Sequence, residues 1–155
     1  MYIRKLQEDD FRQVFGMVSR IHDEGIGAIY FTEMPSEGEF AALFQIKMDN
    51  IRRGDQADFV AIAEGRVIGE CEIVRIREQG GVIGIIVENG SRDRGIGKGL
   101  LLAAIEEAKR MGMLNITAEV AEENVKAVGF FVKMGFVQVV TAVGRGRRIM
   151  HMRIA

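Results

Sequence analysis

Apolar positions change their spacing along the chain, and these changes predict the elements of the fold. The segment from Tyr2 to Leu6 alternates apolar and polar residues, which predicts a short strand. From Asp9 to Glu24 apolar residues recur every three or four positions, which predicts a helix that stops at Gly25. A loop closed by Pro35 follows, and the capping-box pattern Ser36–Glu39 predicts the start of a second amphipathic helix.

The middle of the chain switches to short β-branched runs. DFVAIA (58–63), RVIGECEIVRI (66–76) and GGVIGIIV (80–87) are separated by turn sequences and predict a three-stranded antiparallel meander. A helix from Lys98 to Met111, a strand over 115–121, a helix from Asn124 to Met134 and a final hairpin complete the pattern. The later β-α-β step implies one parallel crossover. We therefore expect an α+β fold, with a mixed, mostly antiparallel sheet and about four helices, in one domain spanning residues 1–155.

Composition narrows the setting of this domain. The 155 residues carry a net charge of -1, which gives no support to nucleic-acid or anionic-membrane binding. No apolar run approaches the roughly 18 residues of a membrane span, and the N-terminus has no apolar signal region. Cys71 is the single cysteine, which favours a reducing cytoplasm. His22 and His151 have no partners at metal-ligand spacing, so no metal is expected.

The segment SRDRGIGKGLL (91–101) lies between a predicted strand and a predicted helix. It is not a Walker A loop, because Gly99 stands where Ser or Thr would hold magnesium, and it does not fit G-x-G-x-x-G either. Free N–H groups at a helix start still favour an anion, and a plain tight turn is the alternative. Its glycines are Gly95, Gly97 and Gly99, and its basic residues are Arg92, Arg94 and Lys98.

Two motifs resemble the GNAT superfamily of acyl-CoA-dependent N-acyltransferases. Residues 92–97, RDRGIG, resemble the family signature Q/R-x-x-G-x-G/A after a central strand. Downstream, the second signature is matched by Asn124, Ala127, Phe131 and Gly135-Phe136. The predicted element order also matches the family from Tyr2 to Ile154.

The resemblance implies acetyl-CoA as the cofactor. Its pyrophosphate would lie on the amides of residues 92–99, and its pantetheine arm would pair with the splayed end of the strand, opened by a β-bulge near Val87. Asn124 would contact the arm, and the helix that follows would pack beside it. The implied cofactor-binding residues are Ile85, Ile86, Val87, Arg92, Arg94, Gly95, Ile96, Gly97, Lys98, Gly99, Asn124 and Phe131.

The sequence departs from the family pattern at two positions. Asp93 places an acid beside the expected phosphate site, where it would pair with Arg92 or Arg94 or weaken the grip on the phosphate. Phe131 replaces a tyrosine that the family uses to protonate the departing thiolate, and it has no proton to give.

Glu119 is the candidate base. It occupies the place of a glutamate base in ribosomal-protein alanine acetyltransferases, and strand alternation allows it to face the cleft. Its rivals are Glu70, Glu72 and Glu88, each expected to be a surface charge. The loop residues Tyr30 and Glu33 are candidates for binding the acceptor.

The sequence therefore predicts an N-acetyltransferase that moves an acetyl group from acetyl-CoA to a primary amine. The acceptor is a small-molecule amine or a protein or peptide amine, and a homodimer is one assembly that the sequence allows. A non-catalytic acyl-CoA-binding or regulatory module is the alternative, and a nucleotide-phosphate binder is a third reading.

Overall fold

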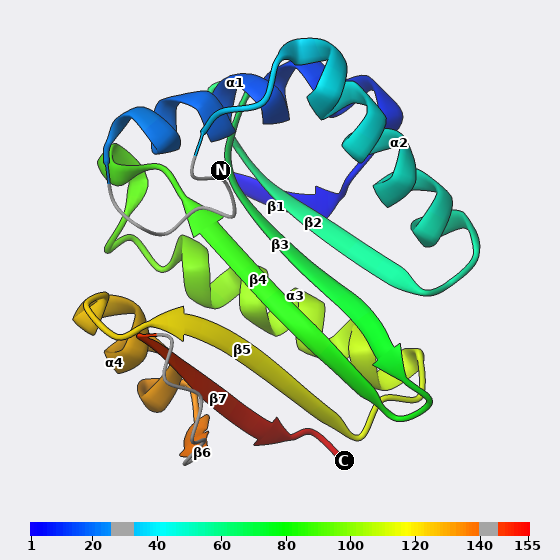
Figure 1. Cartoon of the computed structure of the whole chain (residues 1–155), viewed down its shortest axis with the longest axis vertical. Helices are drawn as coiled ribbons and strands as arrows, with labels where there is room; N and C mark the ends of the chain where they lie inside the picture. Colours follow the sequence, from blue (N-terminus) through cyan, green and yellow to red (C-terminus); the bar gives the residue numbers. More distant parts are fainter. Residues whose placement is uncertain (26–32, 140–145) are drawn as a thin grey trace.

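The computed structural model describes residues 1–25, 33–139 and 146–155. Its strands form one sheet in the order β1-β2-β3-β4-β5-β7-β6, with helices on both faces (Figure 1). The strands are β1 Tyr2–Lys5, β2 Gln56–Ala63, β3 Arg66–Arg77, β4 Gly80–Val87, β5 Asn115–Ala121, β6 Val137–Val139 and β7 Arg147–Arg153. The helices are α1 Phe11–Asp23, α2 Glu37–Arg52, α3 Ile96–Arg110 and α4 Val125–Lys133. The predicted α+β class and element order are confirmed.

Helices α1 and α2 cover one face of the sheet over β1 to β4. Their apolar stripes bury Met17, Ile21 and Phe44 against Val60 and Ile86. The predicted capping box starts α2, because the Ser36 hydroxyl accepts from the Glu39 amide at 3.2 Å and the Glu39 carboxylate accepts from the Ser36 amide at 2.8 Å. This arrangement leaves the same face uncovered by helices over β5 and β7 (Figure 1).

Helix α3 packs on the opposite face, and α4 belongs to the same apolar cluster. The core between them and the sheet contains Leu100, Leu101 and Ile105 of α3 with Ile73 and Ile116 of the sheet. Side chains alternate between the two faces of β5. Ile116, Ala118 and Val120 point into this core, and Thr117 and Glu119 lie on the other face. Leu102 of α3 lies outside this core and is 46 % exposed.

Strands β4 and β5 are paired only at one end. Their parallel pairing joins Gly80–Val82 to Asn115–Thr117, and both strands then continue without pairing to each other. The predicted splay is therefore present at the carboxyl end of β4. The predicted bulge near Val87 is wrong, because β3 and β4 keep a regular register from Gly69↔Val87 to Val74↔Val82 and the irregularity lies between Arg75 and Arg77.

Candidate functional site

The loop after β4 presents a run of unpaired backbone amides. The amides of Ser91 and Arg92 close a 3₁₀ turn onto Glu88 and Asn89, and the amide of Gly99 donates to the Gly95 carbonyl at 3.0 Å. Between them, the N–H groups of residues 93–98 have no acceptor among the residues that the structure describes. Six consecutive donors at the start of α3 make an anion cradle, which the helix dipole strengthens.

Two residues with positive φ shape this cradle. Asp93 has φ 62° and Gly95 has φ 76°, and Gly95 is the N-cap of α3. Helix α3 starts at Ile96, two residues earlier than the sequence pattern indicated, so Ile96, Gly97 and Lys98 form its first turn. The side chains of Asp93, Arg94 and Lys98 are exposed, and none of them pairs with a described residue. Arg94 and Lys98 are thus free to meet an anion.

The glycines of the loop serve different purposes. A Cβ on Gly97 would lie 3.6 Å from the Phe130 ring and 3.8 Å from Ile85, so Gly97 faces these two side chains across a gap that just holds a methyl group. A Cβ on Gly99 would approach Ile3 to 2.7 Å, so Gly99 lets α3 lie close to β1. Because its amide donates to the Gly95 carbonyl, Gly99 is not one of the anion donors, and its role is to position α3 against β1.

Arg92 fastens the loop instead of facing the cradle. Its Nε donates to the Val87 carbonyl at 2.8 Å and its Nη2 donates to Glu24 at 2.8 Å. The other oxygen of Glu24 accepts from the Asn89 amide at 3.1 Å. We call these contacts of Glu24, Asn89 and Arg92 the Glu24 clasp. It ties the end of α1 to the loop, and it occupies the guanidinium that the sequence analysis assigned to the phosphate.

The three residues of β4 predicted to pair with the pantetheine arm do not all direct their backbone groups to the same side of the strand. The Glu88 amide donates to the Ile68 carbonyl, and hydrogen bonding alternates along an antiparallel ladder. Ile86 therefore directs its backbone groups toward β3, whereas Ile85 and Val87 direct theirs toward the splay. The Val87 carbonyl accepts from Arg92, so of the three predicted residues Ile85 is the one with both backbone groups on this edge and no described partner.

Helix α4 contributes one capping residue and two aromatic rings. Asn124 caps the helix, because its Oδ1 accepts from the Ala127 amide at 3.1 Å, and its Nδ2 has no partner in the described part of the chain. Phe131 is 4 % exposed and packs edge-on between Phe130 and Phe136. Phe130 is the ring that reaches Gly97. Phe131 supports the wall that Phe130 presents.

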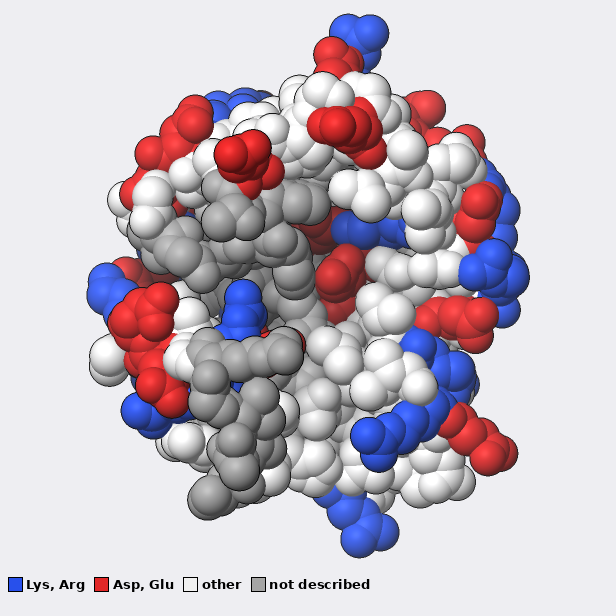
Figure 2. Space-filling model, viewed as in Figure 1, with Lys and Arg blue, Asp and Glu red and all other residues white. Residues whose placement is uncertain are grey.

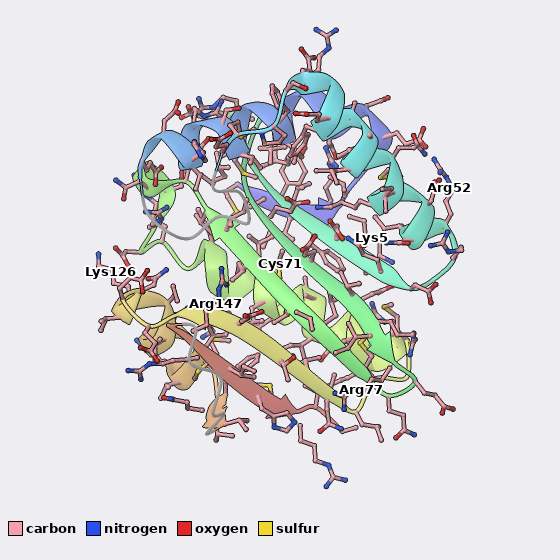
Figure 3. All side chains as sticks on the ribbon, in the orientation of Figure 1. Lys5, Arg52, Cys71, Arg77, Lys126 and Arg147 are labelled. Carbon is pink, nitrogen blue, oxygen red and sulfur yellow. The ribbon has the colours of Figure 1, made fainter. Side chains whose placement is uncertain are left out.

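Glu119 lies on the face of β5 that none of the described helices covers, beyond the last pair with β4. Its carboxylate is 59 % exposed and lies 3.8 Å from Nε of Arg147 on the neighbouring strand β7. Figure 3 shows Arg147 at the end of the sheet where β4 and β5 diverge, and Arg77 at the opposite, paired end. Glu119 borders a hollow of about 730 Å³ along β4, β5 and β7. It is therefore accessible to an acceptor from this face.

The rivals of Glu119 are not the surface charges expected from sequence. Glu88 is 8 % exposed and is held by Arg20 at 2.6 Å and by Arg66 at 3.5 Å. Glu70 is 6 % exposed and Glu72 is half-buried. The alternation of β3 turns both toward α2, where a lysine lies beneath the helix.

This lysine, Lys47, joins three carboxylates. Its Nζ lies 2.6 Å from Glu70, 2.8 Å from Asp58 and 3.1 Å from Glu72. We call these four residues the Lys47 cluster. Burial raises the pKa of Asp58 to about 8, because the loss of hydration outweighs the attraction of Lys47, and repulsion from Glu70 and Glu72 raises the pKa further. Burial alone would lower the pKa of Lys47, but the three carboxylates raise it well above its usual value.

Lys47, Glu70 and Glu72 line a pocket of about 220 Å³ between α2 and β4, and Asp58 lies buried behind Lys47. Figure 2 shows the hollow below α2, with acidic and basic side chains meeting inside it. The sequence analysis missed Lys47 and Asp58, although an aspartate inside the apolar run DFVAIA was a signal that a buried partner exists. Of the predicted acceptor residues, Glu33 is exposed and Tyr30 lies outside the described residues.

Two negative findings concern the described residues alone. Within 1–25, 33–139 and 146–155, no helix is long and apolar enough to cross a membrane. In the same ranges, no three His, Cys, Asp or Glu side chains are placed to hold a metal ion.

Comparison with known proteins places these features in a family. Residues 10–136 match the model of the acetyltransferase (GNAT) family. An N-acetyltransferase from Staphylococcus aureus Mu50 superposes with a TM-score of 0.87 at 20% identity, over 99% of this chain and 98% of that chain. A ribosomal-protein-alanine N-acetyltransferase from Brucella melitensis superposes with a TM-score of 0.80 at 21% sequence identity, over 98% of each chain. A phosphinothricin acetyltransferase from Sinorhizobium meliloti, in complex with acetyl-CoA, superposes with a TM-score of 0.81 at 22% sequence identity. The match covers 98% of this chain and 87% of that chain.

Proposed function

Because this chain belongs to the GNAT family of acetyltransferases, we propose that it transfers the acetyl group of acetyl-CoA to the nitrogen of an amine acceptor. The observation that carries the proposal is the cradle of six free amides at the mouth of the splayed strands. A pyrophosphate needs such donors, and a long polar arm needs the unpaired edge beside them. The name of the Brucella melitensis neighbour supports an amine as acceptor.

The proposed cofactor site uses a smaller set of residues than the sequence motif suggested. The amides of residues 93–98, with Arg94 and Lys98, would bind the pyrophosphate. The Ile85 backbone would pair with the arm, and Asn124 would donate its free Nδ2. Phe130 would pack against the arm beside Gly97. Acetyl-CoA supplies an activated thioester, so the protein must orient it and manage the protons of the amine.

We propose Glu119 as the group that takes the proton from the reacting amine. It borders the splay from β5, and its exposed carboxylate has Arg147 as its one ion-pair partner among the described residues. The buried Phe131 carries no proton, so the departing thiolate would take its proton from water or from the acceptor. A thiol with a pKa of roughly 8.5 is a tolerable leaving group near neutral pH, which makes a dedicated acid unnecessary.

The direct test measures thiol release from acetyl-CoA with a panel of amines, together with mass detection of the acetylated product. Acetyl-CoA at about 100 times its dissociation constant should stabilise the fold by roughly 2.7 kcal/mol. A melting shift without product from any amine would favour the non-catalytic acyl-CoA-binding module. A larger shift with ATP than with coenzyme A would overturn both readings.

A further inference from the structure

The Lys47 cluster carries more negative than positive charge into its pocket. Three carboxylates surround one ammonium, and even a protonated Asp58 leaves Glu70 and Glu72 against Lys47 alone. Glu72 spends one oxygen on Lys47, and its Oε1 has no partner in the described residues. The pocket wall is therefore short of a cation.

One carboxylate of the same cluster is closed off from water and has Lys47 as its one cationic partner among the described residues. The Asp58 side chain is fully buried, and its Oδ2 makes no hydrogen bond within the described structure, although Lys47 Nζ lies 2.8 Å away. A buried carboxylate whose charge only one ammonium offsets, beside two further carboxylates, is held in its protonated form at a cost in charge pairing. A cation entering the pocket would draw the proton from Asp58 and strengthen the pair that its Oδ2 makes with Lys47.

The remaining walls of the pocket are apolar. Phe40 and Phe44 of α2 face Ile86 of β4 across the carboxylates. The volume of about 220 Å³ equals the share of roughly seven water molecules in the liquid. Such a pocket accepts a short aliphatic chain that ends in a positive charge, and it excludes a large or acidic group.

We propose that this pocket binds a second cationic group of the acceptor, distinct from the amine that is acetylated, so that compact aliphatic diamines are the preferred acceptors. This inference rests on the proposed acetyltransferase function and specifies its substrate class. Neighbouring strands lie about 4.8 Å apart, so a linker of about four or five methylene groups reaches from the carboxylates of β3 past β4 to the splay.

The cluster does not hold the reacting amine, for an electrostatic reason. An ammonium beside Glu70 and Glu72 is stabilised in its protonated form, and a protonated amine is not a nucleophile. The reacting amine must therefore lie elsewhere, and the exposed Glu119 on the far side of the splay is available to deprotonate it. One end of the acceptor is kept charged while the other end is made neutral.

The first experiment compares two probes of equal length, 1,5-diaminopentane and n-pentylamine. Wild-type protein should acetylate the diamine with a kcat/KM roughly 10–100-fold higher, because a hydrogen-bonded charge is worth that much when partly buried. Glu72→Gln should abolish this preference by lowering the kcat/KM for the diamine to about the value for n-pentylamine. The control Glu106→Gln, on exposed α3 surface, should keep the preference.

A diamine preference that is absent from wild type, or that survives in both Glu72→Gln and Glu70→Gln, overturns the inference and leaves the acetyltransferase function standing. If no amine is acetylated, the proposed function fails, and binding then decides the pocket by itself. Calorimetry of 1,5-diaminopentane at pH 7 in two buffers of different ionisation enthalpy should show proton release in wild type and none in Asp58→Asn. Absence of diamine binding to the wild-type protein would overturn the pocket assignment independently.

Discussion

At the scale of single residues, a substitution at Gly97 should affect cofactor binding and folding stability in opposite directions. Its added Cβ would make only ordinary contacts with Phe130 and Ile85, at 3.6 and 3.8 Å, and would occupy the opening beside the cradle. Gly97→Ala should therefore weaken acetyl-CoA binding about tenfold while the helix gains roughly 0.5–1 kcal/mol. Gly129→Ala is a matched control, because that glycine also lies in a helix and has open space around it. Calorimetry and thermal unfolding of both variants test this, and equal affinities would refute the placement of the arm.

Glu119 is the residue on which the chemical step depends. Glu119→Gln keeps the size of the side chain and removes the base, so kcat should fall by about 10²–10⁴. The KM for acetyl-CoA should hardly change, because the cradle is formed by residues 93–98. Steady-state kinetics over a range of pH would check both values. If the variant keeps the pH profile and kcat of wild type, then water or another carboxylate, and not Glu119, takes the proton from the amine.

The sequence predicted where the motif residues lie in the fold. It did not predict the contact that each of them makes. The spacing of Gly95 and Gly97 located the cradle because free helix-start amides need no side-chain contacts. Arg92 could not be assigned, because its partner Glu24 is 68 residues away and only the folded chain brings them together. The burial of Glu70 depends in the same way on Lys47 of α2.

At the scale of elements, the Glu24 clasp connects α1 to the loop that carries the cradle. Glu24→Ala removes the acceptor of two hydrogen bonds, from Asn89 and Arg92, and leaves the loop less ordered before cofactor binding. The KM for acetyl-CoA should rise roughly 3–10-fold with little change in kcat, because ordering then opposes binding alone. Asp23→Ala, at an 84 % exposed neighbour, should change neither value. Glu24→Gln should restore part of the affinity, and its failure to do so would argue for a purely structural role.

The order of the elements was readable because each has a distinct apolar period and clear stop signals at Gly25, Gly112 and Gly135. The bulge near Val87 was wrong because the strands part without one, since pairing between β4 and β5 simply stops after Val82. Strand alternation gave the correct face for Glu119. It could not reveal that α2 encloses Glu70, because the packing of a helix on a sheet is not local in sequence.

At the scale of the whole molecule, Asp58 makes stability depend on pH. Its pKa in the folded state, about 8, exceeds its ordinary value of 3.8, so its contribution is full below pH 4 and is lost as pH rises through 8. Asp58→Asn removes this titration and resembles the protonated form. Between pH 4 and 8 the free energy of unfolding of wild type should fall relative to the variant, by on the order of a few kcal/mol. Urea titrations at several pH values measure this, and parallel pH curves would place the proton elsewhere.

The short pairing between β4 and β5 makes the sheet two plates joined by a pivot. Among the described residues, backbone pairing between β4 and β5 is confined to Gly80–Val82, and a side chain on Gly81 would meet the sulfur of Met113 at 2.6 Å. From this pivot to Val87 the strand runs roughly 16 Å, so a rotation of about 10° moves the mouth by about 3 Å. We expect a larger side chain at Gly81 to widen the open end of this gap, and so to change how thick an acyl group it admits.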